Sequence, residues 1–369
     1  MNPSLFTPTT LQNRELKNCV IAAPPPSLLA AADGRATSEL LDYYQNLAST
    51  GVGMLIVEAT AVSAEGRAWP NQTAIFDHDS LNGFSRLTEK IRLHGALPVI
   101  QLYHGGMNSI PGPGHTVYSA SSMRHSKINA VIAEMKPDKI DKTISDYVQA
   151  AKSAWNTGFS GIHLQAAEGS LPHQFLSPMT NLRRDDYCFA ENSGALFLQE
   201  LITAVKSAVP DLILIVSLPL RDLLPGGAGL KDAIQVARTL KKNRHDLIMI
   251  SEGLKIGQPL LQHPSLDKSA ADAPYAEDAH IFRNETGCRV IMAGKVGTPH
   301  TALSLLKRQT CDFIAVGRTL NREPLWLADH YDNKLLPWQH CLRCPICRAA
   351  TSGCPDQKGV NHWHLLSGI

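Results

Sequence analysis

Short apolar runs and longer amphipathic segments alternate along almost the whole chain. The apolar runs, rich in β-branched residues, predict buried strands at 19–23, 52–58, 97–103, 161–166, 212–219, 246–251, 288–294 and 312–317. Apolar residues at every third or fourth position predict helices between them, including 38–50, 80–95, 142–158, 230–243 and 298–310. Strands and helices in alternation predict a parallel sheet, and eight units predict a closed (β/α)8 barrel, with an open doubly wound sheet as the alternative.

Two segments depart from this repeat. Residues 105–127 are rich in glycine, proline and serine, which predicts a long loop or hairpin over one end of the barrel. The final segment is rich in cysteine and too short to bury a core of its own. We therefore expect a barrel over residues 1–335 and a small cysteine-rich appendage over residues 336–369.

The composition narrows the class of partner. The chain has 369 residues, of which 44% are hydrophobic, so it can bury a large core. Its 35 basic and 33 acidic residues are spread evenly, which argues against binding to nucleic acid or a membrane surface. The first residues do not read as a signal peptide, and the longest apolar run, 212–220, is too short to span a bilayer. We expect a cytoplasmic protein that acts on a small molecule, and a homo-oligomer is compatible with this sequence.

Glycines next to cations follow the last two predicted strands. In barrels of this kind, functional groups gather at the C-terminal ends of the strands. AGKVGTP (293–299) and VGRTL (316–320) both lead into helical sequence. Backbone N–H groups, a helix start and a neighbouring cation together form an anion site, although each glycine alone could only make a tight turn. The predicted phosphate-binding residues are Gly294, Lys295, Gly317 and Arg318.

The cysteines fall into two groups. Cys19, Cys288 and Cys311 lie in or beside apolar runs, where a small buried hydrophobe is the ordinary role, and Cys188 is isolated. A cluster near the C-terminus has a spacing close to that of ferredoxin-like 4Fe-4S ligands, and tetrahedral zinc is the alternative, with two nearby histidines as further ligands. The predicted metal ligands are Cys341, Cys344, Cys347 and Cys354, and the two histidines are His362 and His364.

Several long stretches resemble the old yellow enzyme family of FMN-dependent oxidoreductases. They are LFTPTTLQNRELKN (5–18), GVGMLIVEATAVSAEGR (51–67), HGALPVIQLYHGG (94–106), GFSGIHLQAAEGSLPHQFLSPMTNLRRDDY (158–187), VIMAGKVGTPHTA (290–302) and DFIAVGRTLNREP (312–324). The resemblance implies a barrel that holds FMN, with its phosphate on the two glycine and cation pairs. It also implies ring contacts from Pro24, Pro25 and Ala59, and a hydrogen bond from Gln101 to the pyrimidine edge.

The cofactor side departs from the family at Ile215. The family places an arginine at this position on the fifth strand, beside the flavin atoms that gain negative charge on reduction. A cation about 4 Å away contributes roughly 4 kcal/mol at an effective dielectric constant of 20. Its loss should lower the reduction potential, unless Arg221 or Lys255 takes its place.

The substrate side departs further. Gln165 and Glu168 stand where relatives carry a histidine pair or His-x-x-Asn, Ser170 replaces a proton-donating tyrosine, and Pro26 replaces a flavin-tuning Cys or Thr. An ionised Glu168 would repel a developing enolate, but it would suit a cationic substrate or, with a raised pKa, act as a general acid. These residues could equally satisfy only local hydrogen bonds. His104 and His173 could line the site or be structural, and the predicted catalytic residues are Gln165, Glu168 and Ser170.

The cysteine cluster resembles that of the family's iron-sulfur branch, which includes trimethylamine dehydrogenase and 2,4-dienoyl-CoA reductase. That resemblance implies single-electron transfer between a 4Fe-4S cluster and FMN, with a separate protein or subunit as electron partner. We expect an FMN-dependent oxidoreductase with an atypical site for a small organic substrate. The alternatives are a non-catalytic scaffold or electron-transfer subunit, and a barrel that binds a different phosphorylated ligand.

Overall fold

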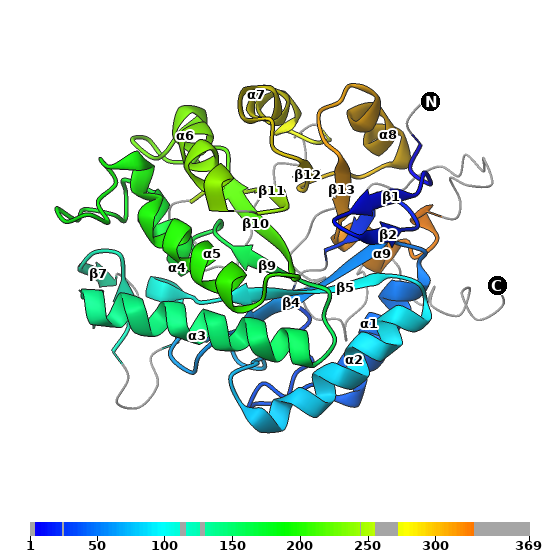
Figure 1. Cartoon of the computed structure of the whole chain (residues 1–369), viewed down its shortest axis with the longest axis horizontal. Helices are drawn as coiled ribbons and strands as arrows, with labels where there is room; N and C mark the ends of the chain where they lie inside the picture. Colours follow the sequence, from blue (N-terminus) through cyan, green and yellow to red (C-terminus); the bar gives the residue numbers. More distant parts are fainter. Residues whose placement is uncertain are drawn as a thin grey trace.

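A closed barrel of parallel strands forms the centre of the molecule (Figure 1). The structure is a computed structural model that describes residues 4–23, 26–110, 116–125, 130–243, 245–254 and 272–327. Each barrel strand pairs with the next along the chain, and the last pairs with the first, so the (β/α)8 prediction is confirmed over the open sheet. The strands are β3 (Val20–Ala22), β4 (Met54–Ala61), β5 (Leu97–Tyr103), β9 (Gly161–Gln165), β10 (Ile213–Pro219), β11 (Leu247–Ser251), β12 (Val290–Met292) and β13 (Phe313–Val316).

Helices pack around the outside of the barrel (Figure 1). The Thr37 side chain accepts from the Leu40 N–H at the start of the first helix, and Thr298 accepts from the Thr301 N–H at the start of another. A proline opens the third helix at residue 137, ahead of the predicted start, because its fixed φ suits a first helical position. The helices are α1 (Ser38–Ser49), α2 (Leu81–Leu93), α3 (Pro137–Asn156), α4 (Leu171–Leu176), α5 (Leu196–Ala208), α6 (Leu230–Leu240), α7 (Ala276–Thr286), α8 (Pro299–Lys307) and α9 (Arg318–Arg322), and single 3-10 turns are η1 (His78–Ser80), η2 (Gly106–Asn108), η3 (Asn192–Gly194) and η4 (Lys241–Asn243).

A hairpin of β1 (Thr9–Leu11) and β2 (Arg14–Leu16) covers the N-terminal end of the barrel. The Gln12 amide donates to Asp246, which directly precedes β11, at 2.9 Å. Leu11 and Leu16 are buried in the main core. Because this hairpin covers the N-terminal ends of the barrel strands, a functional site is expected at their C-terminal ends.

The segment predicted as a loop or hairpin forms a small sheet. It contains β6 (Tyr118–Ser119), β7 (Met123–His125) and β8 (Ala130–Glu134). β7 and β8 are antiparallel, and β6 pairs with β8 in parallel. The predicted hairpin is present as the antiparallel pair of β7 and β8, although β8 lies beyond residue 127, where the predicted segment ended. The predicted boundary between residues 335 and 336 lies outside the described residues.

The core follows from covering both faces of a parallel sheet. Every residue of β4, β9 and β10 is buried, as expected for strands that face the barrel interior on one side and helices on the other. Cys19 and Cys311 lie in this core as predicted, and burial raises the pKa of both thiols, that of Cys19 to about 11. In the part of the chain that the structure describes, no helix is long and apolar enough to cross a membrane.

Candidate functional site

Gln101, Gln165 and Ser217 meet inside the C-terminal end of the barrel. They come from β5, β9 and β10, which are neighbours in the barrel. The amide oxygen of Gln165 accepts from the Gln101 amide at 3.2 Å and from the Ser217 hydroxyl at 2.6 Å. The oxygen of Gln165 is therefore occupied within the protein, and its NH2 group is the part that can serve a ligand.

His163 lies on β9, two residues before Gln165, between the neighbouring strands β5 and β10. It is paired in register with Gln101 on one side and with Ile215 on the other. The Gln101 amide nitrogen lies 3.1 Å from His163 Nδ1, so Nδ1 is the acceptor and the ring proton sits on Nε2. Nε2 is buried and has no hydrogen-bond partner in the part of the chain that the structure describes, and burial lowers the pKa of His163 to about 3. A neutral imidazole thus offers an unused donor in the row that contains Gln101 and Ile215.

The position of the missing arginine stays apolar. Ile215 is fully buried at 0% exposure. Arg221, one of the two replacements considered from the sequence, forms a two-bond pair with Asp278, at 2.8 and 2.6 Å, and its side chain is 48% exposed. Arg221 is therefore used elsewhere in this structure, and Lys255 lies outside the described residues.

Glu168 sits in a turn that follows β9. Its φ of 56° is in the left-handed region, which is uncommon for a residue other than glycine. Its N–H donates to the Glu252 carbonyl at 3.0 Å, and its carboxylate accepts from the Ser251 hydroxyl at 2.6 Å. The turn after β9 is therefore tied to the end of β11, two strands further around the barrel.

Ser170 is placed differently from Gln165 and Glu168. It is fully buried, and its hydroxyl donates to the Gln165 carbonyl at 2.6 Å. The hydroxyl thus fixes the turn between β9 and α4. Donating this proton to a substrate would require the bond to Gln165 to open.

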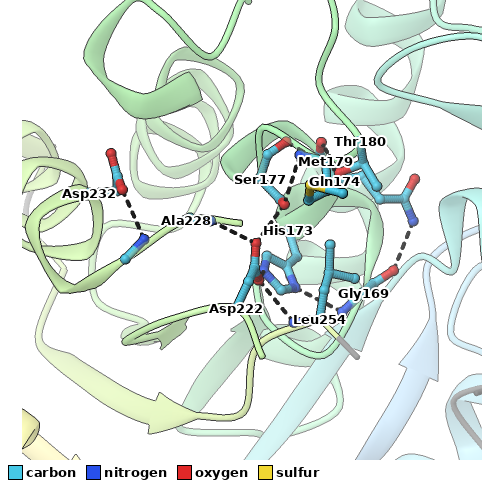
Figure 2. A network of polar contacts seen from close by, with 11 residues as sticks. Gly169, His173, Gln174, Ser177, Met179, Thr180, Asp222, Ala228, Asp232 and Leu254 are labelled. Carbon is cyan, nitrogen blue, oxygen red and sulfur yellow. Dashed lines mark hydrogen bonds and ion pairs between the residues drawn. The ribbon is translucent and has the colours of Figure 1, made fainter. Parts of the chain in front are cut away.

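A buried network around Asp222 holds this turn in place (Figure 2). The Gly169 N–H donates to His173 Nδ1 at 2.8 Å, so His173 carries its proton on Nε2, which lies 3.1 Å from Asp222 Oδ1. Both side chains are 0% exposed. The Ser177 hydroxyl also donates to Asp222, at 2.6 Å, and not to the histidine. The three groups therefore position the loop and lack the arrangement of an activated serine nucleophile.

Asp222 also binds two backbone N–H groups, those of Ala228 at 3.0 Å and Leu254 at 2.9 Å. Burial acts to raise the pKa of this carboxyl, but hydrogen bonds from His173, Ser177 and Leu254 outweigh burial and leave the pKa below its usual value. The charged carboxylate thus joins the loops that follow β9, β10 and β11. His104 is also structural, because its Nδ1 accepts from the Gly106 N–H at 3.0 Å.

Two tyrosines lie in the electrostatic field of Glu168. Tyr103, at the end of β5, is 2% exposed, and its hydroxyl has no hydrogen-bond partner among the described residues. Burial, then the charges of Tyr147 and Glu168, raise the pKa of Tyr103 well above its ordinary value. Tyr275 donates to the Glu252 carboxylate at 3.3 Å, and burial followed by the charges of Glu252 and Glu168 raises its pKa. Neutral phenols and carboxylates therefore gather at this end of the barrel.

The two glycine and cation pairs follow adjacent strands. β12 and β13 pair in parallel, with Met292 opposite Ile314, so Gly294 and Gly317 both lie just beyond their ends. Gly294 has φ 90° and Lys295 has φ 57°, a local backbone form that favours glycine at the first position. Arg318 opens the short helix α9. The fold thus brings the four predicted phosphate-binding residues to neighbouring strand ends.

The residues expected against the flavin ring are described in part. Ala59 is 6% exposed beside an irregularity in β4 between Val57 and Thr60, and it packs with Trp69 and Tyr103. The rings of Trp69 and Tyr103 have centroids 5.3 Å apart. Pro24 and Pro25 lie outside the described residues, and Pro26 is half-buried.

The predicted metal ligands fall outside the described part of the chain. None of Cys341, Cys344, Cys347 and Cys354 is among the described residues. Within the residues that are described, no group of three or more His, Cys, Asp or Glu side chains could hold a metal ion. The cysteine cluster therefore stays a prediction from its spacing.

Sequence reasoning missed three contributors to this site. His163 lies two residues before Gln165 and so faces the same side of β9, which was the available signal. Tyr103 likewise lies two residues after Gln101 on β5. Asp222 gave no local signal, because its partner His173 is 49 residues away along the chain.

The sequence was also compared with known protein families and with characterised relatives. Residues 4–333 match the sequence profile of the NADH:flavin oxidoreductase / NADH oxidase family. The chain is 33% identical over 326 residues to an NADPH dehydrogenase of Bacillus velezensis, covering 88% of this chain and 93% of that protein.

Two solved structures share the fold. A 2-naphthoyl-CoA reductase complex has a TM-score of 0.86 at 20% identity; the match covers 95% of this chain but 56% of the reductase chain. Morphinone reductase in complex with tetrahydroNAD has a TM-score of 0.76 at 24% identity, with 91% and 92% of the two chains covered.

Proposed function

This chain belongs to the NADH:flavin oxidoreductase / NADH oxidase family, the old yellow enzyme family, and from that premise we propose that it keeps the cofactor site while its substrate site has diverged. It is an FMN-dependent oxidoreductase, like the family as a whole. We propose a reduced nicotinamide as electron donor, because the Bacillus velezensis relative is an NADPH dehydrogenase. The acceptor is then a small organic molecule that enters at the C-terminal end of the barrel.

The residues present fit FMN. Gly294 with Lys295, and Gly317 with Arg318, would hold the phosphate, since both pairs lie just beyond adjacent strands. Gln101 and Gln165 would face the ring. The buried Nε2–H of His163 has no acceptor within the described ranges, so it is a donor that a ligand acceptor would satisfy. The observation that carries the proposal is this donor, because a buried N–H without a partner costs about 1 to 3 kcal/mol.

The side chains at the C-terminal end of the barrel would each have a different role. Bound FMN would supply hydride transfer at its N5 atom. Gln165 would orient the substrate through its NH2 group, because its oxygen is taken by Gln101 and Ser217. Glu168 would hold a substrate group through the carboxylate that Ser251 orients. Ser170 would act through the turn that it fixes.

We also propose that the cysteine cluster binds a 4Fe-4S cluster, with zinc as the alternative. Support comes from the spacing of Cys341, Cys344, Cys347 and Cys354 alone. Such a cluster would exchange single electrons with FMN and with a separate electron-transfer protein or subunit. A cytoplasmic location and a boundary near residue 335 are part of the same proposal.

One preparation tests these proposals together. The full chain would be purified without oxygen, its visible spectrum recorded, and its flavin, iron, sulfide and zinc contents assayed. Stoichiometric FMN that NADPH or NADH reduces is the expected result, and a colourless protein without FMN would refute it. Zinc in place of iron and sulfide would refute the 4Fe-4S cluster and the single-electron transfer proposed for it. Flavin that dithionite reduces but NAD(P)H does not would favour a non-catalytic or electron-transfer role.

A further inference from the structure

We propose that the substrate of this enzyme is an organic cation, one that carries a charged group such as a protonated amine besides the group that accepts the hydride, and that the Glu168 carboxylate is the ion-pair partner of that charge. The inference rests on the proposed function, since it concerns the same end of the barrel. It is carried by the fixed position of Glu168, by the charge around it, and by a buried phenol, that of Tyr103, which has no partner among the residues that the structure describes.

Glu168 is held in place from several directions. A left-handed backbone at a residue other than glycine costs on the order of 1 to 3 kcal/mol, and it persists only where neighbours impose it. The Glu168 N–H donates to the Glu252 carbonyl. The adjoining Gly169 donates to His173, and its carbonyl accepts from Gln174, each at 2.8 Å (Figure 2). The same carbonyl also accepts from the Asn108 amide at 2.8 Å. The carboxylate therefore leaves the barrel wall from a backbone that cannot easily move.

The charge of this carboxylate is not matched by a cation within the described residues. It accepts one hydrogen bond, from the Ser251 hydroxyl, and it takes part in no ion pair among them. An ionised carboxylate can accept up to about four hydrogen bonds, so it keeps capacity for a ligand. Position 215, where the family resemblance places an arginine, supplies no cation either, because it holds a buried isoleucine.

Tyr103 is the second observation. Its hydroxyl is buried and has no hydrogen-bond partner in the described part of the chain. Burial, then the charges of Tyr147 and Glu168, raise its pKa, so the phenol lies within the field of the Glu168 charge. It lies two residues beyond Gln101 on the same strand, which directs both side chains to the same face. An ammonium group carries up to three N–H donors, which a carboxylate and a neutral phenol oxygen can accept together.

A second carboxylate strengthens the preference for positive charge. Glu252 is 8% exposed and accepts from Tyr275, whose pKa is raised by burial and then by the charges of Glu252 and Glu168. An anionic substrate or an enolate intermediate would meet like charge here, whereas a cation would meet opposite charge. Glu168 and Glu252 thus disfavour an anionic substrate or an enolate and favour a substrate that carries a protonated amine.

The test compares a cation with its neutral counterpart of similar shape. Benzylamine, protonated at pH 7.5, and benzyl alcohol would be titrated by calorimetry into the full-length protein with its bound flavin. Wild-type protein should bind the ammonium at least about tenfold more tightly than the alcohol, and added salt should weaken only the former. Equal affinities, or no saturable binding of benzylamine, would overturn the proposal.

Three variants assign the preference to its residues. Glu168→Gln keeps an acceptor for Ser251 but removes the charge, so it should abolish the preference while circular dichroism and flavin content stay unchanged. Tyr103→Phe should weaken benzylamine binding by roughly threefold to tenfold, the loss of one hydrogen bond. Glu277→Gln, a control on a side chain that is 74% exposed, should change neither affinity.

A preference that survives Glu168→Gln would overturn the role of this residue. The proposed function fails on a different result, namely a protein that binds no FMN. A protein that binds FMN but shows no preference for the cation would refute the inference alone.

Discussion

Replacing Asp222 by alanine should lower the free energy of unfolding by about 4 kcal/mol. The carboxylate accepts from His173 Nε2–H, the Ser177 hydroxyl and the N–H groups of Ala228 and Leu254, at 2.6 to 3.1 Å. A hydrogen bond to a charged group contributes about 1.5 to 3 kcal/mol, but four such values do not add, because loops relax and water enters the space. Removing one partner of a buried charged pair typically costs about 3 to 5 kcal/mol, which sets the magnitude.

Matched variants test whether the network is the cause. Ser177→Ala removes one donor and leaves three, so it should cost about 1.5 kcal/mol, clearly less than Asp222→Ala. Asp222→Asn should fall between them, because its NH2 group would face donors that need an acceptor. Urea unfolding followed by circular dichroism at pH 7 would give the midpoint and the m-value for each.

The pH dependence gives an independent check. The pKa of Asp222 is below its usual value in the folded state, so its contribution is fully present above the unfolded pKa of about 3.9 and is lost as pH falls through the folded pKa. Asp222→Asn should flatten the stability profile in that acid range. A loss below about 1 kcal/mol for Asp222→Ala, or equal losses for Ser177→Ala and Asp222→Ala, would refute the reasoning.

Three further predictions follow from buried groups at the same end of the barrel. Ile215→Arg should raise the two-electron potential of bound flavin by up to roughly 90 mV, the equivalent of about 4 kcal/mol; an unchanged potential in spectroelectrochemical titration would show that position 215 does not face the ring. Burial lowers the pKa of His163 to about 3 and of His104 to about 4, so the free energy of unfolding should fall as pH drops from about 6.5 toward these values. Urea titrations at several pH values should show a smaller change of unfolding free energy with pH for His163→Gln than for wild type. An unchanged slope would mean that His163 charges easily in the folded protein. Burial raises the pKa of Glu58 to about 7, so Glu58 should lower the free energy of unfolding increasingly as pH rises from about 4.3 to 7. Glu58→Gln should therefore become more stable relative to wild type over that range, and parallel wild-type and variant curves would contradict this.

The barrel was predictable because its signals are local. A buried strand such as 212–219 and an amphipathic helix such as 230–243 each show their period within a few residues, and alternation of the two allows few folds. The structure confirms the eight strands in order around a closed barrel. It changes mainly the ends of elements, as at α3, where Pro137 starts the helix early. The glycine and cation pairs after β12 and β13 were visible for the same reason, since each is one short motif at a strand end.

The amino-acid sequence by itself determined the fold, the family resemblance and the residues that stand at the strand ends. The tertiary structure alone decided what those residues do to one another, because the partners lie far apart in the chain. Ser251 reaches Glu168 across 83 residues, and Asp222 reaches His173 across 49. Which hydroxyl is buried, which carboxylate keeps unused acceptors and which imidazole lacks a partner depend on the register between strands, and that register exists only once the barrel has closed.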